Sequence, residues 1–116
     1  MRIVVALLAL PLTGCVSVAD VRAKPVMFSG ATDKLVNTVA ACVTSAVQSG
    51  PGVLVTSVPL EQGISIIQSA YTPQGITPFI IIDITEVSGK RLIEIRANGR
   101  TPKDPAKNFK PIADCL

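Results

Sequence analysis

The 116-residue chain contains no histidine. Its absence excludes Ser–His and Cys–His catalytic pairs, imidazole zinc sites and histidine general bases. Tryptophan is absent too, and the aromatic residues are Tyr71, Phe28, Phe79 and Phe109. So few rings make a poor stacking platform for sugars or single-stranded nucleic acid. We therefore expect no catalytic residues, no metal or other cofactor, and no nucleic-acid partner.

Charge is also scarce, because only 16% of the residues are charged and the net charge is +3. Hydrophobic residues make up 48% of the chain, which is too apolar and too weakly charged for wholesale disorder. The length suits one small domain.

The first residues have the layout of a secretory signal peptide. Arg2 precedes an apolar run over residues 3–10, which is too short to span a bilayer as a mature helix. The sequence Leu12-Thr13-Gly14-Cys15 resembles the lipobox of bacterial lipoproteins. This resemblance implies that residues 1–14 are removed and that Cys15 carries acyl chains, such as palmitate, that anchor it in a membrane. The alternative is an ordinary signal peptide that is cut elsewhere and leaves Cys15 as a stray thiol.

The residues after the lipobox give an expected location and domain boundary. Val16 stands where lipoproteins retained in the inner membrane often carry aspartate, so the resemblance favours the outer membrane, facing the periplasm. Residues 15–31 show no clean periodicity and are predicted to form a lipidated tether. The folded domain is predicted over residues 32–116.

Two cysteines remain after Cys15 is set aside. Cys42 and Cys115 form an even pair in an exported protein, which favours a structural disulfide. Two buried free thiols or a redox role are the alternatives, although the chain has no Cys-x-x-Cys motif.

The domain is predicted to be α+β. Thr32 is expected to cap a first helix whose apolar stripe includes Val39 and Val43 and also Leu35, Cys42 and Ala46. Alternating patterns then predict four strands, at residues 53–58, 64–71, 79–87 and 91–98. A short final helix is expected from Pro105, kinked or split by Pro111. Short connections favour an antiparallel meander with both helices on one face.

The register of the last two strands follows from a turn at Ser88 and Gly89. This turn places three pairs on one apolar face: Ile84 with Ile93, Ile82 with Ile95, and Ile80 with Ala97. The other face pairs Asp83 with Glu94, Thr85 with Leu92, and Ile81 with Arg96. The two carboxylates form either an acid–base pair or, more simply, a solvated group that Arg96 balances.

The whole layout resembles small, largely uncharacterised lipoproteins of Gram-negative envelopes. The resemblance rests on the lipobox, on Ala41-Cys42-Val43 in the first helix and on Asp114-Cys115-Leu116 at the last cysteine. It brings no known active site with it.

Two surfaces are candidates for interaction. One is the outer side of the sheet, with Phe79, Ile81, Leu92 and Arg96, which would bind a partner or form a dimer, be covered by the tether, or simply stay exposed. The other is a basic segment over residues 90–110, whose Arg100, Lys103, Lys107 and Lys110 would contact an anionic surface or stay solvated.

The sequence therefore predicts a non-enzymatic envelope lipoprotein whose small stapled domain binds an envelope protein or another envelope component. The alternative is a surface inhibitor or exclusion factor that blocks a lysozyme-like hydrolase or a phage. A hydrolase is the least favoured class.

Overall fold

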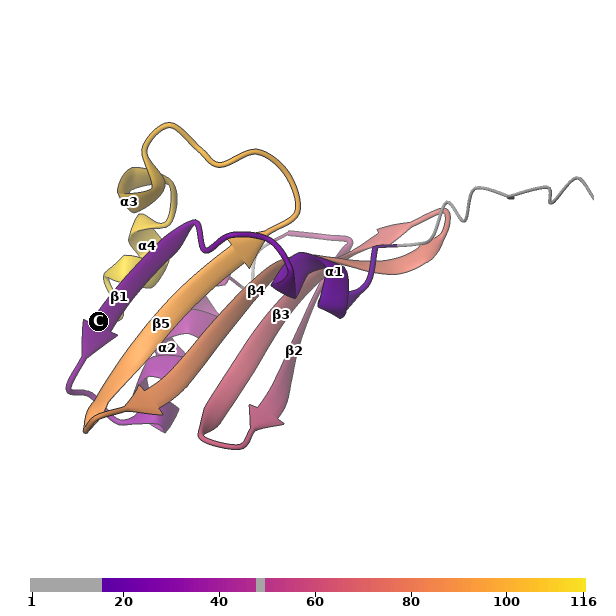
Figure 1. Cartoon of the computed structure of the whole chain (residues 1–116). Coiled ribbons are helices and arrows are strands. Elements are labelled where there is room, and N and C mark those ends of the chain that lie inside the picture. The colour runs from indigo at the N-terminus through magenta and orange to yellow at the C-terminus, as the bar shows by residue number, and fades with distance from the viewer. Residues whose placement is uncertain (1–15, 48–49) are drawn as a thin grey trace, which may run out of the picture.

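The computed structural model describes residues 16–47 and 50–116 as an α+β fold, which confirms the predicted class. The helices are α1 (Val18–Arg22), α2 (Val36–Val47), α3 (Pro105–Asn108) and α4 (Lys110–Ala113). The strands are β1 (Phe28–Thr32), β2 (Val53–Leu60), β3 (Gly63–Thr72), β4 (Gly75–Val87) and β5 (Lys90–Ala97). Figure 1 shows α1 in front of the sheet and α2 behind it.

All five strands form one antiparallel sheet in the order β1-β5-β4-β3-β2. The predicted four-stranded meander is present as β2 to β5, but the strand count was wrong. The fifth strand, β1, pairs with β5, so Phe28 lies opposite Ile95 and Thr32 lies opposite Arg91. Most of β1 falls within the predicted tether, because its residues show no alternating pattern.

The predicted register of the last hairpin is confirmed at every pair. Ile84 lies opposite Ile93, Ile82 opposite Ile95 and Asp83 opposite Glu94. Ser88 and Gly89 both have positive φ, at 52° and 79°, which is typical of the tight type I′ turn that suits strand twist. The isoleucines of the three apolar pairs therefore point to one side of the sheet, which we call the inner face.

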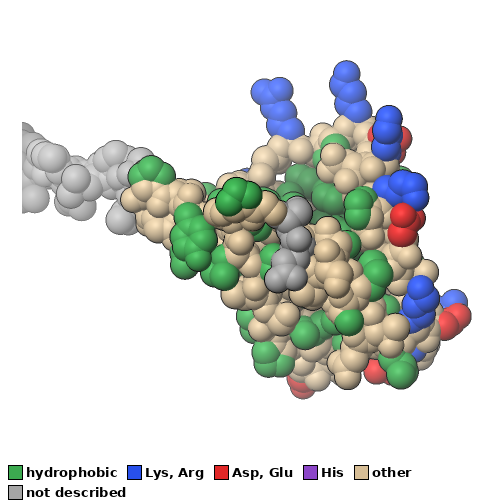
Figure 2. Space-filling view, turned by 180° about the vertical axis from the view of Figure 1, so that it is seen from behind, with side chains coloured by type: hydrophobic (Ala, Val, Ile, Leu, Met, Phe, Trp, Pro, Cys, Tyr) green, Lys and Arg blue, Asp and Glu red, His purple; other side chains and the backbone are tan. Residues whose placement is uncertain are grey.

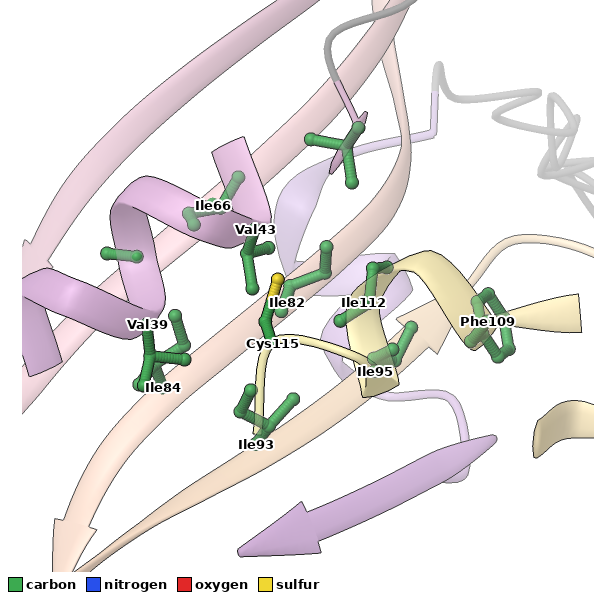
Figure 3. Close-up of a cluster of buried hydrophobic side chains, with 12 residues drawn as sticks. Val39, Val43, Ile66, Ile82, Ile84, Ile93, Ile95, Phe109, Ile112 and Cys115 are labelled. Atoms are coloured by element: carbon green, nitrogen blue, oxygen red, sulfur yellow. The ribbon is translucent and has the colours of Figure 1, made fainter. Parts of the chain in front are cut away.

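The core lies between the inner face and the helices behind it. Figure 3 shows Val39 and Val43 of α2 and Ile112 of α4 directed toward the sheet isoleucines. The fully buried residues on the inner face of the sheet are Ile66, Ile82, Ile84, Ile93 and Ile95. Each buried isoleucine contributes roughly 2 kcal/mol through removal of apolar surface from water. The short α2 depends on this packing, since its valines and threonines are weak helix formers.

The first predicted helix begins later than expected. Thr32 is the last residue of β1, and α2 starts at Val36. Leu35, predicted on the buried stripe, is 69% exposed, while Val36 packs against the core. Thr32 closes the turn instead, because its hydroxyl accepts a hydrogen bond from the Lys34 N–H at 3.2 Å.

The final helical segment is split, as Pro111 predicted, into α3 and α4. Asp104 caps α3 by accepting a hydrogen bond from the Lys107 N–H at 3.2 Å. Phe109 separates the two helices and packs on Phe28 of β1, with ring centroids 6.3 Å apart. This contact joins the end of the chain to the strand that sequence analysis missed.

Cys42 of α2 and Cys115, just after α4, form a disulfide, as predicted. The sulfur of Cys115 lies in the core between α2 and the inner face (Figure 3). The bridge joins residues 73 apart and so encloses the four strands of the meander.

Candidate functional site

The outer face of the sheet, opposite α2, is covered in its centre by α1. Val21 of α1 is fully buried against Ile67 and Ile81, and Val16 and Val18 pack at the edge of this second cluster. The residues predicted as tether therefore dock on the sheet. Of the alternatives predicted for Ile81, the structure matches covering by the tether, because its side chain is 0% exposed beneath α1 and so is not part of an accessible interaction face.

A polar network beside this cluster fixes α1 to the sheet. The Arg22 guanidinium donates to the Ser65 hydroxyl at 2.9 Å and to Asp83 Oδ1 at 3.3 Å. Ser65, on β3, donates its own hydroxyl hydrogen to the same Asp83 oxygen at 2.6 Å. Asp83 is 8% exposed, so its charge lies largely out of water and needs these partners.

Arg96 completes the network from β5. Its Nη1 lies 3.6 Å from Asp83 Oδ2, and its Nη2 lies 3.6 Å from Glu94 Oε2. Its Nε is buried without a hydrogen-bond partner among the described residues. The arginine thus lies between the two carboxylates, as the predicted register implied. Arg96, one of the predicted interaction residues, therefore forms its ion pairs within the domain.

The chemistry of this network is that of a clamp. Ser65 has no exposed surface, and its hydroxyl hydrogen is directed at Asp83, so it cannot reach a substrate. Asp83 and Glu94 are each paired with arginine. What the arrangement does is hold α1 in place.

The start of α1 is fixed by a reciprocal cap. The Ser17 N–H and hydroxyl donate to Asp20 Oδ2 at 2.8 and 3.0 Å, and the Asp20 N–H donates to the Ser17 hydroxyl at 3.2 Å. The backbone and then the side-chain hydrogen bond from Ser17 hold the pKa of Asp20 below its ordinary value of 3.8.

We expect α1 to loosen in acid. A carboxyl with a lowered folded-state pKa stabilises the fold above its unfolded pKa, and this stabilisation is lost as pH falls through the folded value. The protection factors of the α1 amides, which compare their exchange with that of an unfolded chain at the same pH, should therefore fall below about pH 3.8 in the wild type. Asp20→Asn should lack that part of the response, because the amide that replaces the carboxyl of Asp20 does not titrate. Identical pH profiles would contradict this role of Asp20.

The other predicted outer-face residues remain partly exposed. Phe79 and Leu92 are half-buried, and Phe79 occupies the irregularity where β3 and β4 shift register. Sequence reasoning missed Ser65 and Arg22 in the network. Their distances along the chain from Asp83, 18 and 61 residues, carry no local signal.

The basic segment divides into paired and unpaired cations. Arg91 lies near Glu86 and donates to backbone carbonyls of Asp33 and Lys34. Lys110, predicted as a surface contact, lies 2.9 Å from Asp114. Arg100, Lys103 and Lys107 are exposed and have no ion pair within the described part of the chain. Figure 2 shows basic side chains projecting from the edge where Figure 1 places the loop between β5 and α3.

A small hollow lies on the inner-face side of the sheet, between the end of α2, the α3–α4 segment and the sheet. Its volume is about 200 Å³, and Phe109, Ile112 and Ile80 form part of its wall. Small-molecule sites commonly measure about 300–1,000 Å³, so this hollow is below the usual range. Its Gln68 side chain already donates to the Val47 carbonyl at 3.1 Å.

No known family model matches this chain, and no curated protein or solved structure matches it either. Cys15, the predicted lipidation site, lies outside the described residues. Within residues 16–47 and 50–116, no helix has both the length and the apolar character needed to cross a bilayer.

Proposed function

We propose that this chain is a lipid-anchored protein of the bacterial envelope that acts by binding rather than by catalysis. The observation that carries the proposal is the position of α1. The lipobox-like sequence ends at Cys15, and Ser17 already caps α1, whose far end is clamped to Asp83. Acyl chains on Cys15 would therefore hold the sheet close to the bilayer, because very few residues separate the lipid from the folded domain.

The projecting end of the β3–β4 hairpin supports a membrane contact. Tyr71 and Ile76 face each other there and are 62% and 56% exposed. Figure 1 shows this end extending from the same side of the molecule on which the described chain begins. Tyrosine beside an aliphatic residue suits the boundary between lipid and water, where amphipathic rings concentrate.

The unpaired cations Arg100, Lys103 and Lys107 are the proposed contacts for an anionic partner. They lie on a loop and short helix away from the clamp, so binding there would leave the attachment of α1 unchanged. Their charge suits an acidic envelope protein, an anionic lipid headgroup or a polyanionic wall polymer.

The anchor is tested by the intact mass of the protein isolated from a membrane fraction of producing bacteria. We expect a chain that begins at Cys15 and carries the mass of several acyl groups, and we expect Cys15→Ala to lose both the acyl mass and the membrane association. Ser29→Ala, at an exposed position of β1, serves as the matched control and should keep both. A soluble wild-type chain without acyl mass would overturn the proposal.

A further inference from the structure

We propose that the free edge of β2 pairs with β2 of a second copy of this chain. In the described part of the chain, β2 is the last strand of the sheet, and its outer side has no strand beside it (Figure 1). An open strand edge presents unpaired N–H and C=O groups that readily accept another strand. This inference does not depend on lipidation.

The backbone groups that face outward can be identified from the ladder. The Tyr71 N–H donates to the Gly52 carbonyl at 3.1 Å. Hydrogen-bonded pairs recur at every second residue of an antiparallel ladder, so the even-numbered residues of β2 bond to β3. Val53, Val55 and Ser57 therefore direct their N–H and C=O groups away from the sheet.

Two prolines bracket this open stretch. Pro59 belongs to the outward-facing set, where its missing N–H costs no bond to β3. Pro51, just before the strand, is also an odd-numbered residue and so belongs to the same outward-facing set. An antiparallel two-fold pairing centred on Val55 places Val53 opposite Ser57 of the second copy and Pro51 opposite its Pro59. The prolines thus bound the open stretch, and the register centred on Val55 forms about six interchain hydrogen bonds.

The side chains along β2 also suit a second copy. Residues 50–60 contain no charged side chain, so two copies meet without repulsion and without burying a charge. Natural edge strands are commonly protected by a charge or by proline. β2 has no charge, and its proline, Pro59, stands near the end of the strand and leaves the stretch before it open. The other edge, β1, has only five residues and is followed by Asp33 and Lys34.

Apolar side chains on the edge would gain burial from this pairing. Leu54 and Val55 are half-buried, and Val58 is 42% exposed. In the proposed register Leu54 lies opposite Thr56 of the second copy on the outer face. The two-fold axis runs perpendicular to the sheet, so both α1 helices lie on the same side of a ten-stranded sheet. Two lipid anchors would then reach one membrane.

The test is the mass of the full-length protein, as isolated from cells, by light scattering with detergent mass subtracted or by native mass spectrometry. The wild type should be a dimer. Ser57→Pro should be monomeric, because it removes one outward N–H and no bond to β3. The matched control Ser57→Ala keeps the N–H and should remain dimeric. A monomeric wild type, or a Ser57→Pro protein that stays dimeric, would overturn the proposal.

A second variant keeps the test valid where Ser57→Pro fails to fold. Ser57→Lys leaves every backbone group in place and adds a charge at an exposed position of the edge. We expect the dissociation constant of its dimer to be at least tenfold higher than that of Ser57→Ala. The thermal unfolding midpoint, measured at a protein concentration at which both variants are monomeric, should be the same for the two. Equal dissociation constants for the two variants would exclude β2 as the interface.

Discussion

Replacing Cys42 and Cys115 together with alanine will lower the free energy of unfolding by about 4 kcal/mol. The bridge closes a loop with a separation of 73 residues, and its loss frees the unfolded chain to adopt many more conformations. Domains of this size are stabilised by about 5–15 kcal/mol in total, so the expected loss is a large share. The native contacts of α2 and α4 with the inner face otherwise stay in place.

Urea unfolding with and without reductant separates the bridge from the substitutions themselves. The wild type in reductant should approach the stability of the double variant, and reductant should leave the double variant unchanged. A difference below about 1 kcal/mol between oxidised and reduced wild type would show that the disulfide contributes little and that packing dominates. Cys15 is present in both proteins and cancels from the comparison.

Asp83→Asn will cost about 2–3 kcal/mol and release α1 from the outer face. Removing one partner of a buried ion pair leaves the other charge uncompensated, which commonly costs about 3–5 kcal/mol. The lower value applies because the Arg22 side chain is 37% exposed and stays partly solvated. Arg22 and Arg96 would both lose their shared carboxylate.

Glu86→Gln is the matched control for Asp83→Asn. Glu86 also lies on β4 and also pairs with an arginine, Arg91 at 3.9 Å, but its side chain is 57% exposed. Exposed pairs contribute about 0–1 kcal/mol, so this variant should be nearly neutral. The α1 amides should exchange their hydrogens faster than in the wild type only in Asp83→Asn. Equal protection of α1 in both variants would show that apolar packing of Val21 suffices to hold the helix.

The β4–β5 hairpin was predictable because its signal is local. Isoleucine alternates with other residues on both sides of a two-residue turn, and a slip by one position would expose every isoleucine. The pairing of Asp83 with Glu94 followed from the same register. The disulfide was predictable from the even number of cysteines that remain once Cys15 is set aside.

β1 and α1 were not predictable, because their stability comes from distant residues. The sequence Phe-Ser-Gly-Ala-Thr has little strand character of its own and becomes a strand by pairing with β5. Five residues are too few for an isolated helix, and α1 persists through its cap and through Arg22 and Val21 on the sheet. Thr32 was misassigned as a cap for the same reason, since the neighbouring strand β5 determines its conformation.

The position of the disulfide also bears on how the molecule responds to a mechanical load. Every strand of the meander lies inside the covalent ring that Cys42 and Cys115 close, whereas α1 and β1 lie outside it. A force applied between the two ends of the chain is therefore expected to detach α1 and β1 first, because both precede Cys42. The disulfide between Cys42 and Cys115 then carries the tension, so the strands of the meander are not loaded. Stretching therefore lengthens the molecule by its N-terminal arm while the ring stays folded.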